Sequence, residues 1–245
     1  MAKHFVFDPH RRKLLLAGGA AGLAAALIPR HAAGADKIPI GVVGSGHIGG
    51  TVGSLWVEAG HPVLFSSRHP EELGDLVRRL GPLARAGTVA QAIAFGDALL
   101  VAVPYKALPE LGRDYAAALR GKIVLDACNA AAARDGAIAD EVEQNGIGVT
   151  SQKYLAGTRL VRAFNTMSYM ILAREANRPE PRMAIPIAGD DADAVSMAAQ
   201  LVRDAGFDPV VVGKLADARR FQRGGPGYGQ SVSAAELRRT LSLPP

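Results

Sequence analysis

The residues best placed to do chemistry are three glycines spaced G-x-G-x-x-G, at Gly44, Gly46 and Gly49. They follow an apolar, β-branched run at 38–43 and precede a stretch with helical spacing. In that setting the first glycine permits a tight turn, the second lets the backbone approach a pyrophosphate, and the third lets the helix pack against the strand. The helix N-terminus then offers free N–H groups and a positive dipole end to phosphates. The pattern predicts a dinucleotide held by Gly44, Ser45, Gly46, His47, Ile48 and Gly49, with a purely structural turn as the alternative.

The end of the second predicted strand, 62–65, indicates which dinucleotide to expect. A site for NAD usually has an acidic residue there, about 20 residues past the glycines, to accept the ribose hydroxyls. This chain has Ser67 and Arg68 instead. A hydroxyl and a guanidinium suit a 2′-phosphate, so we expect NADP(H). The alternative is an arginine that is merely solvated in a loop.

A third strand, predicted at 98–103 from its unbroken apolar run, ends at Pro104 and Tyr105. Ligands of open α/β sheets bind at the carboxyl ends of strands. We therefore expect Val103, Pro104 and Tyr105 to border the channel for the dinucleotide. The alternative is that Pro104 only ends the strand.

Two further predicted strands, 122–125 and 160–164, are each followed by an asparagine, Asn129 and Asn165. An amide side chain can hydrogen-bond the carboxamide of a nicotinamide or a substrate, so both are candidates for the reacting end of the site. No catalytic triad or carboxylate pair is evident, which suits direct hydride transfer. Cys128 is more simply explained as core packing than as a reactive thiol.

The composition excludes several other functions. A single cysteine and histidines without ligand spacing argue against a metal site. The formal net charge is +5, but residues 1–35 carry five basic residues and one acidic, leaving only +1 for the remainder. The excess of basic residues therefore lies in residues 1–35, and it does not indicate a nucleic-acid-binding protein.

Residues 1–35 have the layout of an export signal. The pair Arg11 and Arg12 precedes a 15-residue apolar stretch at 14–28, and small residues at 33–35 offer a cleavage site. The pair resembles a twin-arginine signal, used by the route that exports folded proteins. We expect an exported, periplasmic protein that meets the export machinery through this leader. An uncleaved anchor and a cytosolic leader are the alternatives, which cell fractionation separates.

Alternation of strands and helices predicts the fold class: a doubly wound, Rossmann-type, mostly parallel sheet with helices on both faces and a short irregular C-terminal extension. Helices are expected at 70–80, 89–95, 107–119 and 192–205, the last capped by the carboxylates of Asp190 and Asp191. The domains expected are the leader at 1–35, an NADP-binding domain at 36–215 and a glycine-rich tail at 216–245. A short helix in the tail begins at Ser233, with Glu236 completing a capping box.

Together these motifs resemble the NADPH-dependent reductases of coenzyme F420, a deazaflavin. The resemblance is carried, in order along the chain, by residues 44–49, 66–68, 101–104, 163–166 and 187–191. It implies that residues 45–48 hold the pyrophosphate, that Ser67 and Arg68 hold the 2′-phosphate, and that hydride passes directly between nicotinamide and deazaflavin. It also implies a homodimer, by analogy.

The chain departs from that family in two places. Glu71 and Glu72 stand where the family often has a lysine for the 2′-phosphate, and the glycine-rich tail replaces an apolar C-terminal helix beside the deazaflavin. We expect an enzyme: an NADP(H)-dependent oxidoreductase whose second substrate is a deazaflavin, a flavin or another small redox acceptor. The alternative is an exported module that binds a dinucleotide without turnover. A pyrroline-carboxylate or hydroxy-acid dehydrogenase would normally need a long helical C-terminal domain.

Overall fold

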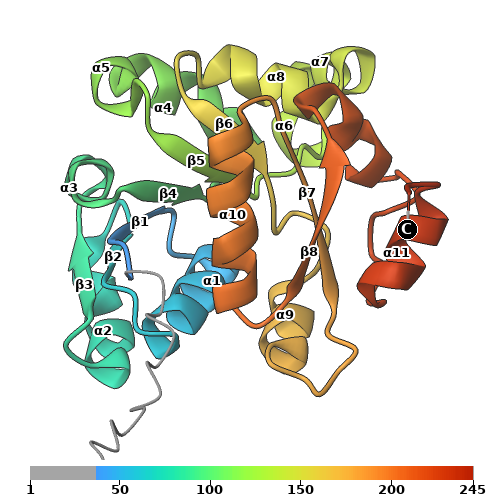
Figure 1. Cartoon of the computed structure of the whole chain (residues 1–245). Helices are drawn as coiled ribbons and strands as arrows, with labels where there is room; N and C mark the ends of the chain where they lie inside the picture. The colour runs from blue at the N-terminus through green and yellow to red at the C-terminus, as the bar shows by residue number, and fades with distance from the viewer. Residues whose placement is uncertain (1–36, 245) are drawn as a thin grey trace, which may run out of the picture. The chain divides into compact units, whose positions relative to one another are not determined.

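Eight strands form one sheet in the computed structural model, which describes residues 37–244 (Figure 1). They are β1 (Ile40–Val43), β2 (Val63–Ser66), β3 (Ala84–Gly87), β4 (Ala98–Val101), β5 (Ile123–Asp126), β6 (Arg159–Arg162), β7 (Ala184–Gly189) and β8 (Asp208–Gly213). Their order is β3-β2-β1-β4-β5-β6-β7-β8, and every pairing is parallel except that of β6 with β7. Strands β2 and β3 are added on one side of β1, and strands β4 to β8 are added on its other side. The predicted doubly wound, mostly parallel sheet is therefore confirmed.

Helices cover both faces of the sheet. One face carries α1 (His47–Glu58), η1 (Pro70–Leu73), α2 (Gly74–Leu80), α9 (Tyr169–Glu175) and α10 (Ala192–Asp204). The other carries α3 (Val89–Phe95), α4 (Leu108–Asp114), α5 (Ala116–Leu119), α7 (Ala137–Asn145), α8 (Ile147–Tyr154), η3 (Leu215–Phe221) and α11 (Ala234–Thr240). Two short elements, η2 (Tyr105–Ala107) and α6 (Ala132–Asp135), lie in loops that follow β4 and β5. Figure 1 shows α10 crossing the front of the sheet.

The strands β1, β2 and β4 are buried on both faces, which explains their largely apolar sequences. In β4, Ala98 and Leu100 pack on the α10 side, while Leu99 and Val101 pack on the α4 side. All four side chains are 0% exposed. This burial fixes the register, because a slip of one residue would exchange the two faces.

Several boundaries differ from the sequence expectation. β3 was not predicted, since its sequence Ala-Arg-Ala-Gly has no β-branched residue and forms an edge strand. The helix α8 begins at Ile147, because Gly146 with φ +84° provides the turn before it. The helix expected at 107–119 is broken at Tyr115 into α4 and α5. The predicted cap of α10 is confirmed for Asp191, which accepts a hydrogen bond from the Ala194 backbone N–H at 2.8 Å. It is wrong for Asp190, whose carboxylate accepts instead from the Leu215 N–H at 3.0 Å.

The C-terminal segment packs into the core of the same sheet. Ser233 and Glu236 form the capping box of α11, whose Leu237 is 0% exposed. Upstream, the backbone N–H of Gly229 donates to the carbonyl of Thr166 at 3.1 Å. The glycine-rich loop is therefore bonded to the segment after β6, where the sequence predicts site residues.

The leader predicted at 1–35 lies outside the described residues. Within residues 37–244, no helix is long and apolar enough to traverse a bilayer. The same part of the chain holds no cluster of side chains suited to a metal ion.

An ion pair between Asp126 and Arg162 joins β5 to β6 inside the sheet. The two residues are register partners in the parallel ladder, and both side chains are 0% exposed. Arg162 also donates to the Cys128 carbonyl at 2.6 Å, and the Cys128 N–H donates to Asp126 at 2.9 Å. Because these charges are fully buried, each depends on the other for solvation.

We predict that Arg162→Met lowers the free energy of unfolding by about 3–5 kcal/mol, because it leaves the Asp126 carboxylate buried without a cation. Urea denaturation measures the loss. The double variant Asp126→Leu with Arg162→Met removes both charges and should recover most of the stability. Equal stability of the single variant and the wild type would contradict the assigned role of the pair.

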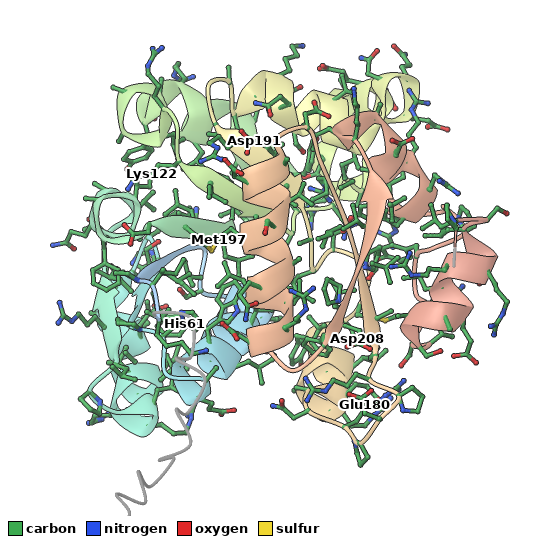
Figure 2. The ribbon with its side chains drawn as sticks, in the orientation of Figure 1. His61, Lys122, Glu180, Asp191, Met197 and Asp208 are labelled. Atoms are coloured by element: carbon green, nitrogen blue, oxygen red, sulfur yellow. The ribbon has the colours of Figure 1, made fainter. Side chains whose placement is uncertain are left out.

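A second polar cluster lies at the amino ends of the strands, where His61 precedes β2 and lies to the left of the lower part of α10 in Figure 2. His61, 2% exposed, bonds the Ile38 carbonyl at 3.0 Å and the Asp204 carboxylate at 2.9 Å. Lys37 and Gln200 also donate to Asp204, at 3.1 and 3.0 Å. Burial alone would raise the pKa of Asp204, but these donors outweigh burial and hold the pKa below its usual value.

The pKa of Asp204 is lower in the folded chain than in the unfolded chain, so its stabilisation is present above the ordinary carboxyl range, about pH 4. That stabilisation is lost as pH falls through the folded pKa. Asp204→Asn should therefore destabilise the protein at pH 7, and its difference from wild type should shrink between about pH 5 and 3. Urea midpoints across this range measure the effect, with the exposed Asp97→Asn as control. A constant difference would exclude the linkage.

Candidate active site

The turn after β1 is as tight as its glycines predict. Gly44 has φ +93°, and a Cβ atom there would lie 2.6 Å from the Ala102 carbonyl. A Cβ on Gly49 would lie 2.0 Å from the Gly44 carbonyl. These contacts exclude any larger residue, so the two glycines bring the ends of β1 and β4 and the start of α1 together.

Gly46 is different, because a Cβ atom there would meet no protein atom within 4 Å. It is the N-cap residue of α1, a 12-residue helix with no acidic side chain in its first turn. The neighbouring Ser45 hydroxyl oxygen is buried and has no hydrogen-bond partner within the described chain. An open backbone, unpaired N–H groups and an unpaired hydroxyl fit a bound pyrophosphate.

The end of β2 lies beside this loop, since the Ser45 N–H donates to the Ser66 carbonyl at 3.0 Å. Ser67 accepts a hydrogen bond from the His69 N–H at 3.1 Å, which shapes the turn. Arg68 is exposed, and no carboxylate in residues 37–244 lies within 4 Å of its guanidinium. The side chain is thus available to a phosphate, while Glu71 bonds His69 at 3.3 Å.

The three residues expected to border the channel at the end of β4 differ in exposure. Val103 is half-buried against Gly44, and Pro104 is exposed. The expected role of the Tyr105 side chain is wrong: it is 0% exposed in the core, with its hydroxyl 3.0 Å from Ser151 Oγ. The turn η2 begins at Tyr105 and directs its ring inward, away from the crevice.

The two predicted asparagines meet. Asn129 Nδ2 donates to the Asn165 carbonyl at 2.6 Å, and Asn165 Nδ2 donates to the Phe221 carbonyl at 3.2 Å. The Asn165 side-chain oxygen and the Thr166 hydroxyl are buried without partners in the described residues. Phe164 precedes them with φ +58°, a left-handed conformation that costs energy in a bulky residue. This strain, together with the unpaired oxygens, is typical of a ligand-binding position.

Two residues at the candidate site, Thr166 and Tyr169, were not predicted from the sequence. Thr166 is part of the segment 163–166 but was not singled out, although it directly follows Asn165. Tyr169 stacks on His47 with ring centroids 4.2 Å apart, which brings the start of α9 to the glycine loop. The two rings border a groove of about 660 Å³ along α1. Nothing in the sequence pairs residues so far apart.

Cys128 is not a reactive thiol in this structure. It is 2% exposed, and burial followed by the charge of Asp126 raises the pKa of its thiol well above the usual value. The thiolate needed for nucleophilic or redox chemistry is therefore disfavoured. This agrees with the prediction that Cys128 serves in packing.

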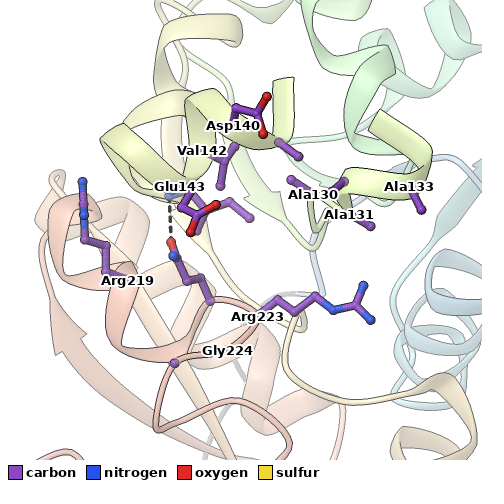
Figure 3. Close-up of a pocket in the computed structure, with 14 residues that line it drawn as sticks. Ala130, Ala131, Ala133, Asp140, Val142, Glu143, Arg219, Arg223 and Gly224 are labelled. Carbon is purple, nitrogen blue, oxygen red and sulfur yellow. Dashed lines mark hydrogen bonds between the residues drawn. The ribbon is translucent and has the colours of Figure 1, made fainter. Parts of the chain in front are cut away.

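A cavity of about 770 Å³ lies beside the loop that follows β5 (Figure 3), and its lining residue Ala130 directly follows Asn129 in the chain. One wall is the segment 130–133 and the helix α7, and the other is the turn 222–225 with Arg219. Its volume suits a small organic ligand.

The sheet order and the glycine loop define the class of fold: a Rossmann-type α/β fold, with the loop at the position where this fold binds nucleotides. Residues 39–130 match the sequence profile of a family described as NADP oxidoreductase, coenzyme F420-dependent. The resemblance drawn from the motifs is confirmed over this segment.

Individual proteins resemble this chain in sequence or in fold. The chain is 27% identical to Metalloreductase STEAP3 of Rattus norvegicus over 190 residues, 75% of this chain but only 35% of that protein. A Sinorhizobium meliloti structure, the hypothetical protein SMa0349, has a TM-score of 0.67 at 25% identity, covering 80% of this chain and 95% of its own. An Arthrobacter structure named as a candidate F420-dependent NADP reductase has a TM-score of 0.64 at 22% identity, covering 74% and 87%.

We predict that Gly46→Ala leaves folding stability nearly unchanged but weakens NADPH binding by at least ~10-fold, about 1.4 kcal/mol, because its methyl group meets no protein atom and occupies the phosphate position. Calorimetric titration and thermal melting measure the two quantities. Gly50→Ala, one turn along α1, is the matched control and should retain binding. Undiminished affinity in Gly46→Ala would show that phosphate does not approach there.

Proposed function

We propose that this chain is an NADP(H)-dependent oxidoreductase that passes hydride between nicotinamide and a small redox acceptor of the flavin or deazaflavin type. The observation that carries the proposal is the open backbone at Gly46, beside the unpartnered Ser45 hydroxyl and at the N-terminus of α1. The match of residues 39–130 to an NADP oxidoreductase family supports it.

The chain supplies binding along the carboxyl ends of β1, β2 and β4. The N–H groups of the first turn of α1 and the Ser45 hydroxyl receive the pyrophosphate. Ser67 and Arg68 receive the 2′-phosphate, for which Arg68 offers a planar pair of donors. Val103 and Pro104 border the same crevice, next to Gly44.

The reacting end lies at the carboxyl ends of β5 and β6. Asn165 directs its amide N–H to Phe221, which leaves its side-chain oxygen to accept from the carboxamide of nicotinamide. Thr166 offers a hydroxyl beside it. When bound, NADPH supplies the hydride itself. These residues therefore orient the nicotinamide and exclude water, and they need not move a proton.

The choice of acceptor rests on the relatives. The family description names coenzyme F420, whereas the rat relative is named as a metalloreductase. We favour a flavin or deazaflavin as direct acceptor because hydride transfer needs a two-electron acceptor, which a ferric ion is not. The whole STEAP3 chain is much longer than this one, so its metal reduction is not carried over.

We expect wild-type protein, from residue 36, to bind NADPH at least ~10-fold more tightly than NADH, and Arg68→Ala to remove most of that preference. The guanidinium is expected to pair with the 2′-phosphate, a group that NADPH has and NADH lacks. Its removal should therefore weaken the binding of NADPH and leave that of NADH nearly unchanged. Titrations with both nucleotides measure the ratio. Arg78→Ala, an exposed arginine on α2, is the matched control and should keep it.

NADPH oxidation is then followed with riboflavin, a deazaflavin and a ferric chelate in turn. Turnover with a ring acceptor supports the proposal. Tight NADPH binding without turnover on any acceptor would favour a binding module, and failure to bind either nucleotide would refute the cofactor site.

A further inference from the structure

The segment 163–168, which leads from β6 to α9, connects the two ends of the proposed dinucleotide site. Near its start lie Asn165 and Thr166, whose side-chain oxygens have no hydrogen-bond partner among residues 37–244. Directly after it comes Tyr169, the first residue of α9, which stacks on His47 of the glycine loop. The position proposed for nicotinamide and the position proposed for pyrophosphate are therefore joined by a short piece of chain.

The stack of His47 on Tyr169 is close and nearly parallel. The ring centroids lie 4.2 Å apart, and the ring planes make an angle of 13°. His47 is also the first residue of α1, so its backbone N–H is one of those that have no partner within the helix. The backbone of this residue can thus receive a phosphate while its side chain contacts α9.

A second aromatic contact fixes the start of the segment on the same helix. The ring of Phe164 meets that of Trp56 edge to face, with centroids 5.8 Å apart, and both side chains are buried. Phe164 has the left-handed φ of +58°, which a bulky residue keeps only where its surroundings hold it firmly. The helix α1 therefore holds the segment at both ends, through Trp56 and through His47.

Hydrogen bonds hold the middle of the segment from the side of the C-terminal tail. Asn165 Nδ2 donates to the Phe221 carbonyl at 3.2 Å, and the Thr166 carbonyl accepts from the Gly229 N–H at 3.1 Å. Neither bond involves α1. The stack therefore provides a link from this segment to the N-terminus of α1, where the phosphates are expected.

We propose that Tyr169 is a positioning residue for the nicotinamide and acts through its stack on His47. The stack holds the segment 163–168 against the N-terminus of α1. A dinucleotide whose pyrophosphate lies at the glycine loop then meets Asn165 and Thr166 with its carboxamide. This inference rests on the proposed NADP(H) oxidoreductase function, and it gives the tyrosine ring a role without requiring its hydroxyl.

Positioning of this kind separates two parts of cofactor binding. The phosphates bind at the glycine loop and at the end of β2, and the turn of that loop is set by the contact of Gly44 with the Ala102 carbonyl. The carboxamide binds at the segment that the stack holds. Loss of the stack should therefore weaken the contribution of nicotinamide to affinity and leave the contribution of the phosphates nearly unchanged.

The test compares NADPH with 2′-phospho-ADP-ribose, which has the same phosphates but no nicotinamide. Calorimetric titration measures both dissociation constants. In Tyr169→Ala the affinity for NADPH should fall about fivefold, as expected for the loss of one stacked pair, while that for 2′-phospho-ADP-ribose changes by less than about twofold. Tyr169→Phe keeps the ring and should restore the affinity for NADPH.

The partner ring gives an independent check. His47→Ala keeps the backbone N–H and should reproduce the effect of Tyr169→Ala. The double variant should bind NADPH no more weakly than either single variant, because all three remove the same contact. Met170→Ala is the matched control, since Met170 is next in the chain and 62% exposed, and it should match the wild type. Thermal melting confirms that each variant is folded.

Three results would overturn the inference and leave the phosphate site of the proposed function standing. They are unchanged NADPH affinity in Tyr169→Ala, an equal fall in affinity for both ligands, and a wild type that binds the two ligands equally. A Tyr169→Phe variant as weak as Tyr169→Ala would also overturn it, because the hydroxyl and not the stack would then be responsible. Failure of the wild type to bind either ligand would instead refute the proposed function.

Discussion

The buried ion pair of Asp126 and Arg162 is the interaction on which the proposed reacting end of this protein depends. It joins the last residues of β5 and β6, which are register partners, in a place where neither charge meets water. Through Cys128 the same pair fixes the backbone that leads to Asn129. Removing either partner would leave a buried charge, so the geometry of the asparagines and the stability of the sheet are coupled.

The two halves of the sheet carry different parts of the candidate site. The strands β1, β2 and β4 bring three loops together at Gly44, where the contacts are too close for any other residue, and leave Gly46 open. The strands β5 and β6, with the tail bonded to Thr166 and Asn165, build the wall of a second cavity. In the proposed function, a nucleotide held by the first half ends beside the second, which is the arrangement that hydride transfer requires.

Much of the fold and the site could be predicted because the signals are local. The glycine spacing predicts the loop, the apolar runs predict the central strands, and Asp191 and Ser233 mark the starts of α10 and α11. Asn129 and Asn165 follow from strand ends, because parallel strands end at one edge. Tyr105 was misplaced for the same reason: its position after β4 is a sequence property, whereas the inward direction of its ring is set by the turn η2 and by Ser151.

The sequence by itself determined the class of fold, the tight glycine loop before α1 and the preference expected for NADP(H), since each depends on residues close together in the chain. Only the tertiary structure decided the stacking of His47 on Tyr169, the strained Phe164, the unpaired oxygens of Asn165 and Thr166, and the cavity beside Arg223. These depend on the packing of segments up to a hundred or more residues apart, as between His47 and Tyr169. No local propensity or spacing encodes such contacts; they form when apolar burial fixes the register of the strands.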